Sequence, residues 1–290
     1  MDTQDLQRIL DKYTKFHNLS DDYFSIMNDN DLFSLKDKND ILTCGDILGF
    51  NSDNELVNAN FCRKRICPMC QWRKAEKTFS QFIRLSDILT KEGYRFLHLV
   101  LTVPNCTHNK LNSTINDIYK AFSKFIRYKE IKRAFKGISR FLEITFNYEA
   151  FNFHPHLHCL IAVNHSYFND TRTYLSYSKL QELWTKAYKS NEPLSISIGT
   201  IKNELGFAEV SKYCVKPLNL DDENIAGNTE ILTALSYTLK GKRFTQSYGV
   251  IAEKLKLIKN DDKNREHKTN TEQMFTYIWD SDSRGYKKLN

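Results

Sequence analysis

Three histidines at alternate positions are the residues of this chain whose type and spacing most directly indicate chemistry. His154, His156 and His158 stand in the stretch FNFHPHLHCLIAV, residues 151–163. Alternate side chains of a β-strand point to the same face, so three imidazoles would line one side of such a strand. Imidazole binds borderline divalent metals, and a carboxylate beside two imidazoles leaves positions open for water or substrate. The row therefore predicts half of a metal site that needs a carboxylate.

The preceding stretch, ISRFLEITFNYE, supplies that carboxylate. It is also predicted to be a strand, and the short connection to the histidine strand indicates an antiparallel hairpin. A tight turn near Ala150 would set Glu143 opposite His158 on the same face, whereas a one-residue slip would turn it away. We expect Glu143 to complete a site with His156 and His158. The alternative third ligand is His154, which could instead orient one of the others.

A second chemical set lies in GFAEVSKYCVKP, residues 206–217, which is predicted to be a short helix. Glu209, Tyr213 and Lys216 fall on one face of it. Ionising a tyrosine at pH 7 costs about 4 kcal/mol, so a tyrosine nucleophile needs a nearby metal or cation. Beside the histidine row this set is suited to phosphoryl transfer. Taken alone, the segment favours a tyrosine packed on the sheet between surface charges, and it is the pairing with the histidine strand that favours chemistry.

Cysteine placement predicts a second metal site. Four of the 7 cysteines fall in the first quarter of the chain, at Cys44, Cys62, Cys67 and Cys70. The last two form a CPMC turn of the zinc-knuckle kind, and four thiolates suit a tetrahedral structural zinc. The alternative is a group of buried free thiols.

Basic charge surrounds these cysteines. The net charge is +7 overall, but residues 61–140 carry +13 by our count while residues 1–40 carry −4. Such a distribution favours a nucleic-acid partner, and its alternative is a set of solvated helix faces. The side chains that we expect to contact the phosphate backbone interleave with Trp72 and are Arg63, Lys64, Arg65, Arg73 and Lys74.

The surrounding pattern predicts the elements that would position both sites. Strands are predicted at 95–105, 138–149, 151–163 and 194–199, and helices at 114–134 and 177–189. This β-α-β-β-α-β order is that of the split βαβ, ferredoxin-like arrangement, an α+β fold with a central antiparallel sheet. The expected organisation is an acidic mobile extension (1–40), a Cys-rich, zinc-binding-like basic module with a helix (41–90), the main domain (91–250) and a C-terminal tail (251–290).

Membrane and nucleotide-binding signatures are missing from the sequence. There is no N-terminal apolar signal segment, and the longest apolar runs, such as FLHLVLTV, are far too short to cross a bilayer. There is also no P-loop or dinucleotide fingerprint. We therefore expect a cytoplasmic protein that uses no nucleotide cofactor.

Four ordered motifs together resemble a known family. They are CRKRICPMCQWRKA, HLVLTVPN, FHPHLHCLIAV and FAEVSKYCVK, and they span about residues 40–250. In order and character they resemble the replication initiator (Rep) proteins of small rolling-circle bacterial plasmids, members of the HUH endonuclease superfamily. The resemblance implies an HUH nicking domain that acts on plasmid origin DNA, single-stranded or in an extruded hairpin, together with a host helicase and polymerase.

The resemblance also implies roles for single residues. His156 and His158 match the ligands of a divalent ion, usually Mg or Mn. Tyr213 matches the nucleophile that forms a 5′-phosphotyrosyl bond and leaves a 3′-hydroxyl primer. Glu209 matches the carboxylate that activates water for the terminating cleavage, and Lys216 can offset negative charge that develops on the phosphate.

Two other interpretations remain open at this point. In one, the chain is a non-enzymatic, zinc-dependent DNA-binding regulator with a structural histidine row. In the other, it is an HUH transposase or relaxase that shares the chemistry on a different substrate. Within the nicking hypothesis Tyr237 is a rival nucleophile with Lys240 three residues on, but Thr233 stands where a carboxylate is expected.

Overall fold

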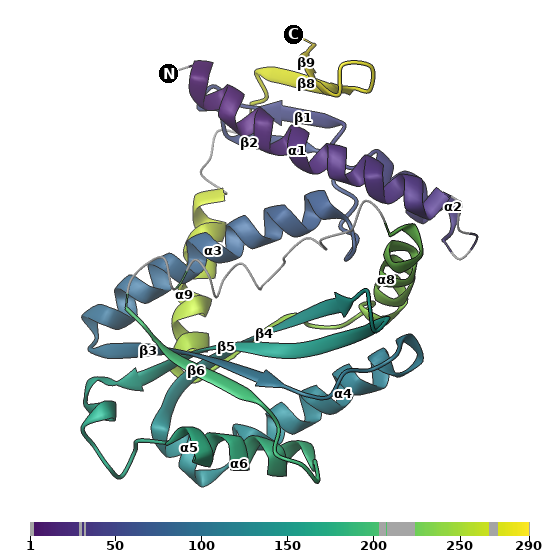
Figure 1. The fold of residues 1–290 in the computed structure, drawn as a ribbon. Coiled ribbons are helices and arrows are strands. Elements are labelled where there is room, and N and C mark those ends of the chain that lie inside the picture. Colours follow the sequence, from purple (N-terminus) through teal and green to yellow (C-terminus); the bar gives the residue numbers. More distant parts are fainter. Residues whose placement is uncertain are drawn as a thin grey trace. The chain divides into compact units, whose positions relative to one another are not determined.

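The chain is divided into two compact units. The computed structural model describes residues 3–28, 31, 33–202, 207, 224–266 and 272–289 (Figure 1). Unit 1 combines Met1–Lys74, Pro217–Lys240 and Asn264–Asn290, and unit 2 combines Ala75–Lys216 and Gly241–Lys263. Among the described residues, no helix is long and apolar enough to cross a membrane.

Unit 2 is built on a five-stranded antiparallel sheet. Its strand order is β6-β3-β5-β4-β7. The strands are β3 (Tyr94–Thr102), β4 (Phe135–Asn147), β5 (Asn152–Asn164), β6 (Ile196–Ile201) and β7 (Thr245–Tyr248). The helices are α4 (His108–Phe125), α5 (Lys129–Ala134), α6 (Tyr177–Tyr188), α9 (Gly249–Glu266) and the later part of α3 (Pro68–Lys91), with the short 3-10 helix η1 (His165–Phe168) after β5. The α+β prediction and its antiparallel sheet are confirmed.

Alternating side chains of the strands build a core on each face of this sheet. Helices α4 and α6 cover one face (Figure 1), where Trp184 meets Phe125 edge-on at 5.9 Å between ring centroids. On the other face, helices α3 and α9 pack against the sheet in a cluster of buried apolar residues. Its members include Phe82, Leu85, Leu89, Phe96, Phe141, Leu160, Ala162, Phe207, Ile251, Leu255 and Ile258. The histidine row of β5 shares this second face, because Phe141 pairs with His158.

Buried Arg140 of β4 contacts residues of α4 and of β7. The Arg140 guanidinium lies 3.7 Å over the ring of Tyr119 and donates hydrogen bonds to the carbonyl of Arg243 (3.2 Å) and to Oε1 of Gln246 (3.0 Å). A buried charge is tolerated only when its hydrogen bonds are satisfied, and the aromatic face adds a cation–π attraction. These contacts join the sheet centre to α4 and to β7.

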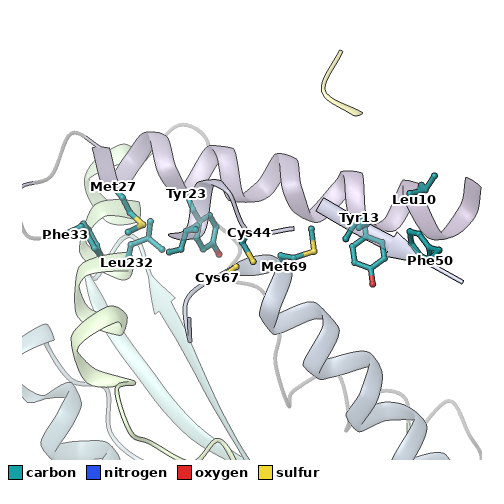
Figure 2. Packing of buried hydrophobic residues seen from close by; sticks show 12 residues of the cluster. Leu10, Tyr13, Tyr23, Met27, Phe33, Cys44, Phe50, Cys67, Met69 and Leu232 are labelled. Atoms are coloured by element: carbon teal, nitrogen blue, oxygen red, sulfur yellow. The ribbon is translucent and has the colours of Figure 1, made fainter. Parts of the chain in front are cut away.

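Unit 1 holds the cysteine segment. A four-stranded sheet runs in the order β2-β1-β8-β9. Its strands are β1 (Ile47–Phe50), β2 (Leu56–Ala59), β8 (Phe275–Asp280) and β9 (Gly285–Lys288), and its helices are α1 (Thr3–Asn28), α2 (Leu35–Leu42), α8 (Ile225–Thr238) and the first turns of α3. Figure 2 shows the apolar face of α1 directed toward the cysteine segment, with Tyr13, Tyr23 and Met27 in the same buried cluster as Cys44 and Cys67.

Both ends of the chain differ from the sequence-based expectation. The segment expected to be a mobile extension (1–40) forms α1 and α2, and α1 buries Leu10, Tyr13, Tyr23 and Met27. The segment expected to be a tail (251–290) contributes Ile251 to the core of unit 2, and its strand β8 pairs with β1. In residues 1–40, burial of apolar residues at helical spacing outweighs the acidic composition that suggested disorder. In residues 251–290, apolar burial on α9 and the pairing of β8 with β1 order the chain.

Candidate metal centre

Three side chains of unit 2 converge on one point of the sheet. His156 Nε2 and His158 Nε2 each lie 2.8 Å from Oε2 of Glu143. Their candidate ligand atoms all lie within 4.8 Å of one another. The residues are 8%, 5% and 9% exposed, respectively. Two imidazoles and a carboxylate at this spacing can hold a divalent cation and leave coordination positions open for substrate.

The hairpin between β4 and β5 brings these groups together. In the ladder Glu143 pairs with His156 and Thr145 pairs with His154. The predicted pairing of Glu143 with His158 is therefore wrong by two residues. The turn is longer than expected and contains Phe151 in a left-handed conformation with φ of 49°. A shift of two residues preserves the face on which a side chain lies, so Glu143 still reaches both imidazoles.

The second nitrogen of each imidazole is also engaged. His156 Nδ1 donates to the carbonyl oxygen of His154 at 3.1 Å. His158 Nδ1 lies 2.9 Å from Nε2 of His98, which comes from the neighbouring strand β3. Sequence reasoning missed His98. The available signal was its place in the strand HLVLTVPN, where it shares a face with Val100, and Val100 pairs with His158.

The surroundings of Glu143 favour its ionised form. Burial raises the pKa of this carboxyl, but hydrogen bonds and charge interactions with both histidines outweigh burial and bring the pKa to about 2. The carboxylate is therefore ready to accept a cation at neutral pH. Burial lowers the pKa of His154.

His154 is turned to another partner. Its Nδ1 donates to Oδ1 of Asn105 at 2.6 Å, and its ring centroid lies 5.0 Å from that of His156. Among the described residues it does not belong to the group of three convergent ligands. His154 contacts the site through its main-chain carbonyl, which accepts the hydrogen bond from Nδ1 of His156.

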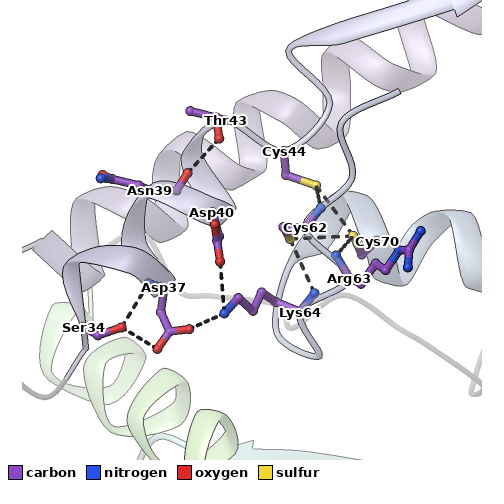
Figure 3. Close-up of polar contacts among 10 residues, drawn as sticks. All are labelled: Ser34, Asp37, Asn39, Asp40, Thr43, Cys44, Cys62, Arg63, Lys64 and Cys70. Atoms are coloured by element: carbon purple, nitrogen blue, oxygen red, sulfur yellow. Dashed lines mark hydrogen bonds and ion pairs between the residues drawn. The ribbon is translucent and has the colours of Figure 1, made fainter. Parts of the chain in front are cut away.

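The four cysteines of unit 1 form the second group. Their sulfur atoms lie within 4.8 Å of one another, with Sγ to Sγ distances of 3.6 Å for Cys44 and Cys70 and 3.7 Å for Cys62 and Cys70 (Figure 3). Four thiolates at about 2.3 Å from a zinc ion stand about 3.8 Å apart, so this spacing fits a tetrahedral site. Hydrogen bonds from the neighbouring thiols lower the pKa of Cys70.

Main-chain amides donate hydrogen bonds to the sulfur atoms of Cys44, Cys62 and Cys70, as they do to thiolates that bind a metal. The amide of Cys62 donates to Cys44 at 3.3 Å, that of Arg63 to Cys70 at 3.1 Å and that of Lys64 to Cys62 at 3.5 Å (Figure 3). Arg63 adopts a left-handed conformation with φ of 59°. This conformation directs its amide onto Cys70 at the cost of backbone strain.

The basic side chains predicted to contact DNA differ in their exposure. The Lys64 ammonium pairs with Asp37 and, at 3.1 Å, with Asp40 (Figure 3). The Arg73 guanidinium lies 3.8 Å over the ring of Phe61. These two residues therefore have partners within unit 1. The exposed members of the predicted set are Arg63, Arg65 and Lys74.

The predicted nucleophile segment lies outside the described residues. This applies to Glu209, Tyr213 and Lys216. Phe207, just before them, is described and meets Phe96 of β3 edge-on at 4.7 Å between ring centroids. The rival tyrosine, Tyr237, lies on α8 in unit 1 and is 76% exposed.

Comparisons with known proteins identify the family. A family model described as "Replication protein" matches residues 53–287. "Protein rep" of Streptococcus pneumoniae serotype 2 (strain D39 / NCTC 7466) is 35% identical over 195 residues, which cover 63% of this chain and 61% of that protein. "Protein rep" of Lactiplantibacillus plantarum is 33% identical over 248 residues, covering 79% and 76%. "Protein rep" of Staphylococcus aureus is 35% identical over 181 residues, covering 60% and 79%. No solved structure shows a significant match. The chain therefore belongs to the Replication protein (Rep) family of plasmid replication initiators.

Proposed function

We propose that this initiator is a metal-dependent, site-specific endonuclease and strand transferase that nicks one strand of the plasmid origin through Tyr213. The observation that carries the proposal is the convergence of His156, His158 and Glu143 within 4.8 Å in a chain of the Replication protein family. Each imidazole has an acceptor or partner at its second nitrogen, which is how metal-binding histidines are held in proteins.

The topology of unit 2 supports the HUH assignment. Along the chain the elements run β3, α4, α5, β4, β5, α6 and β6, and the sheet places β6 and β4 outside β3 and β5. Apart from the added short helices α5 and η1, this is the β-α-β-β-α-β order of the ferredoxin-like arrangement. The nicking domain then corresponds to unit 2, and the Cys-rich module lies in unit 1.

The residues at the site can receive a phosphodiester. A divalent cation such as Mg or Mn, bound by Glu143, His156 and His158, would polarise the scissile phosphate as a Lewis acid. Glu143 supplies the negative charge that such a cation requires, because its carboxyl is ionised at neutral pH. Lys216 offsets the negative charge that develops on the phosphate.

The cleavage step is a transesterification. The Tyr213 oxygen loses its proton and attacks phosphorus; the bond from phosphorus to the 3′ oxygen breaks, and that oxygen takes up a proton. The products are a 5′-phosphotyrosyl ester and a 3′-hydroxyl that primes synthesis. Because the ester conserves the energy of the broken bond, rejoining needs no nucleotide cofactor. In the terminating cleavage Glu209 takes a proton from water, which attacks phosphorus at the restored nick site and breaks the bond to the 3′ oxygen. The 3′-hydroxyl so formed attacks the phosphotyrosyl ester, which joins the DNA ends and frees Tyr213.

The remaining parts of the chain are assigned supporting roles. Cys44, Cys62, Cys67 and Cys70 hold a structural zinc ion that shapes unit 1. The exposed basic residues beside this cluster contact the phosphate backbone near the origin. In the bacterial cytoplasm a host helicase then unwinds the duplex and a host polymerase extends the 3′-hydroxyl.

The test is covalent capture of DNA. The full chain is incubated with Mn and a single-stranded oligonucleotide that carries the candidate nick site, and adducts are separated on a denaturing gel. We expect an adduct with the unaltered chain and with Tyr237→Phe, and none with Tyr213→Phe or His156→Ala. Tight binding of the same DNA without an adduct, for every divalent ion tried, would favour the non-enzymatic regulator.

A further inference from the structure

His98 contacts the metal centre without being one of its three convergent ligands. It lies on β3, whose Val100 pairs with His158 of β5. Its Nε2 is 2.9 Å from Nδ1 of His158, and the two rings are nearly parallel, with centroids 5.2 Å apart and an interplanar angle of 22°. The pairing of β3 with β5 thus places a third imidazole directly behind one of the two metal-facing imidazoles.

The chemistry of imidazole assigns a direction to this hydrogen bond. His158 faces Glu143 with Nε2, so Nε2 must carry a free electron pair to bind a cation. The single proton of the neutral ring then resides on Nδ1, and Nδ1 needs an acceptor. Nε2 of His98 lies within hydrogen-bonding distance of this atom. His98 therefore accepts the hydrogen bond when His158 serves as a ligand.

The two imidazole ligands are held by different kinds of acceptor. Nδ1 of His156 donates to the main-chain carbonyl of His154, which no substitution removes. Nδ1 of His158 contacts the side chain of His98 instead, so a substitution at position 98 can remove this acceptor and change the metal affinity. Partners of this kind typically change metal affinity by about 10- to 100-fold.

We propose that His98 is a positioning residue that holds His158 in the tautomer and orientation required for metal binding. The inference rests on the proposed metal centre of the nicking site. It adds the interaction through which strand β3, which contributes none of the three convergent ligands, controls the affinity of the site.

The experiment compares two substitutions of the same residue in the full chain. In His98→Gln the side-chain amide oxygen can occupy the place of Nε2 and still accept a hydrogen bond. In His98→Leu the bulk is kept and the acceptor is lost. His165→Leu is the matched control, since it removes an exposed histidine of unit 2 that bonds to Arg95 away from the site.

The first readout is the dissociation constant for Mn²⁺, measured by titration with electron paramagnetic resonance of the free ion. We expect about a 10- to 100-fold loss for His98→Leu and near wild-type affinity for His98→Gln and His165→Leu. Equal affinity of His98→Leu and the unaltered chain would overturn the inference. So would an equal loss in His98→Gln and His98→Leu, which would indicate packing alone. No Mn²⁺ binding by the unaltered chain would refute the metal centre itself.

The second readout is the tautomer of His158 in the Mg²⁺-loaded protein, from long-range ¹H–¹⁵N correlation spectra. We expect the proton on Nδ1 in the unaltered chain and in His98→Gln, and a mixture of tautomers in His98→Leu. A proton on Nε2 of His158 in the unaltered chain would show that the ring points its donor at the site and would overturn the inference.

Discussion

Removal of the proposed zinc ion from the four-cysteine cluster is expected to unfold unit 1 and to spare unit 2. The perturbation is a strong chelator added to the full chain under reducing conditions. Cys44 and Cys67 are fully buried within the apolar cluster that also contains Tyr23 and Met27. Without the ion, four thiols remain at thiolate spacing in the centre of that cluster, and loss of the ion therefore acts directly on the core.

The magnitude follows from the size of the unit. A unit on the order of 120 residues has a folding free energy of about 6–18 kcal/mol. A structural zinc ion contributes an apparent 10–16 kcal/mol at neutral pH in small zinc-dependent folds. The two quantities are comparable, so the metal-free unit is expected to retain little or none of its stability. The buried core of unit 2 contains none of the four cysteines.

The three tryptophans of the chain allow both units to be observed at once. Trp72 stacks on Phe16 at 4.8 Å and Trp279 stacks on His17 at 3.9 Å, both in unit 1, whereas Trp184 is buried in unit 2. In protein labelled with 5-fluorotryptophan, chelation should move two ¹⁹F signals to unfolded positions and leave the third unchanged.

Zinc content is measured in parallel by mass spectrometry of the metal. We expect one zinc ion per chain, its loss in Cys70→Ser and its retention in Cys106→Ser, which alters a buried thiol of unit 2 outside the cluster. Protein that contains no zinc and keeps all three ¹⁹F signals in chelator would refute the reasoning.

Three further outcomes are expected. Trp184→Phe removes the indole N–H that donates to the carbonyl of Thr102 at 2.8 Å, which should lower the free energy of unfolding of unit 2 by about 1–3 kcal/mol. The melting temperature should fall by about 2–10 °C, and an unchanged melting temperature would contradict this. The pKa of Glu143 is about 2 in the folded protein against an ordinary 4.5, so its carboxylate should add about 3 kcal/mol to the free energy of unfolding of the metal-free protein above pH 4.5. This stabilisation should be lost as the pH falls toward 2. Denaturant titration should show that the stability of Glu143→Gln lacks this pH dependence. Lys64→Ala breaks ion pairs within unit 1, so it should lower the stability of unit 1 with little effect on DNA affinity. Arg65 is exposed, and Arg65→Ala should weaken DNA binding and reduce its dependence on salt concentration. The reverse pattern would contradict the roles given to these two residues.

The central hairpin was predictable because its pattern is local. Alternation along the histidine strand and the short connection to the preceding strand are sufficient to place Glu143 on the same face as the imidazoles. The error of two residues in register arose in the turn. Phe151 adopts a positive φ there, a conformation that a phenylalanine does not predict. The cysteine grouping was predictable for a related reason, since four cysteines so close in sequence, two of them in a CPMC turn, are typical of a metal site.

Interactions between distant segments were not predictable in this way. Strand β8 pairs with β1 across more than two hundred residues of chain, and nothing in either short strand specifies the other. The contact of His98 with His158 depends on the register of β3 against β5, which no turn fixes. Helix α1 carries an apolar stripe from Leu10 to Met27. The acidic composition of residues 1–40 suggested a mobile extension, because composition takes no account of the spacing of the apolar residues.

The most direct test of the central claim is identification of the residue that becomes bonded to DNA. The covalent adduct formed with origin oligonucleotide and Mn is digested with nuclease and protease, and the modified peptide is sequenced by mass spectrometry. The proposed mechanism predicts a nucleotide joined through a 5′-phosphate to the hydroxyl of Tyr213. A nucleotide on Tyr237 or on any other residue would contradict it.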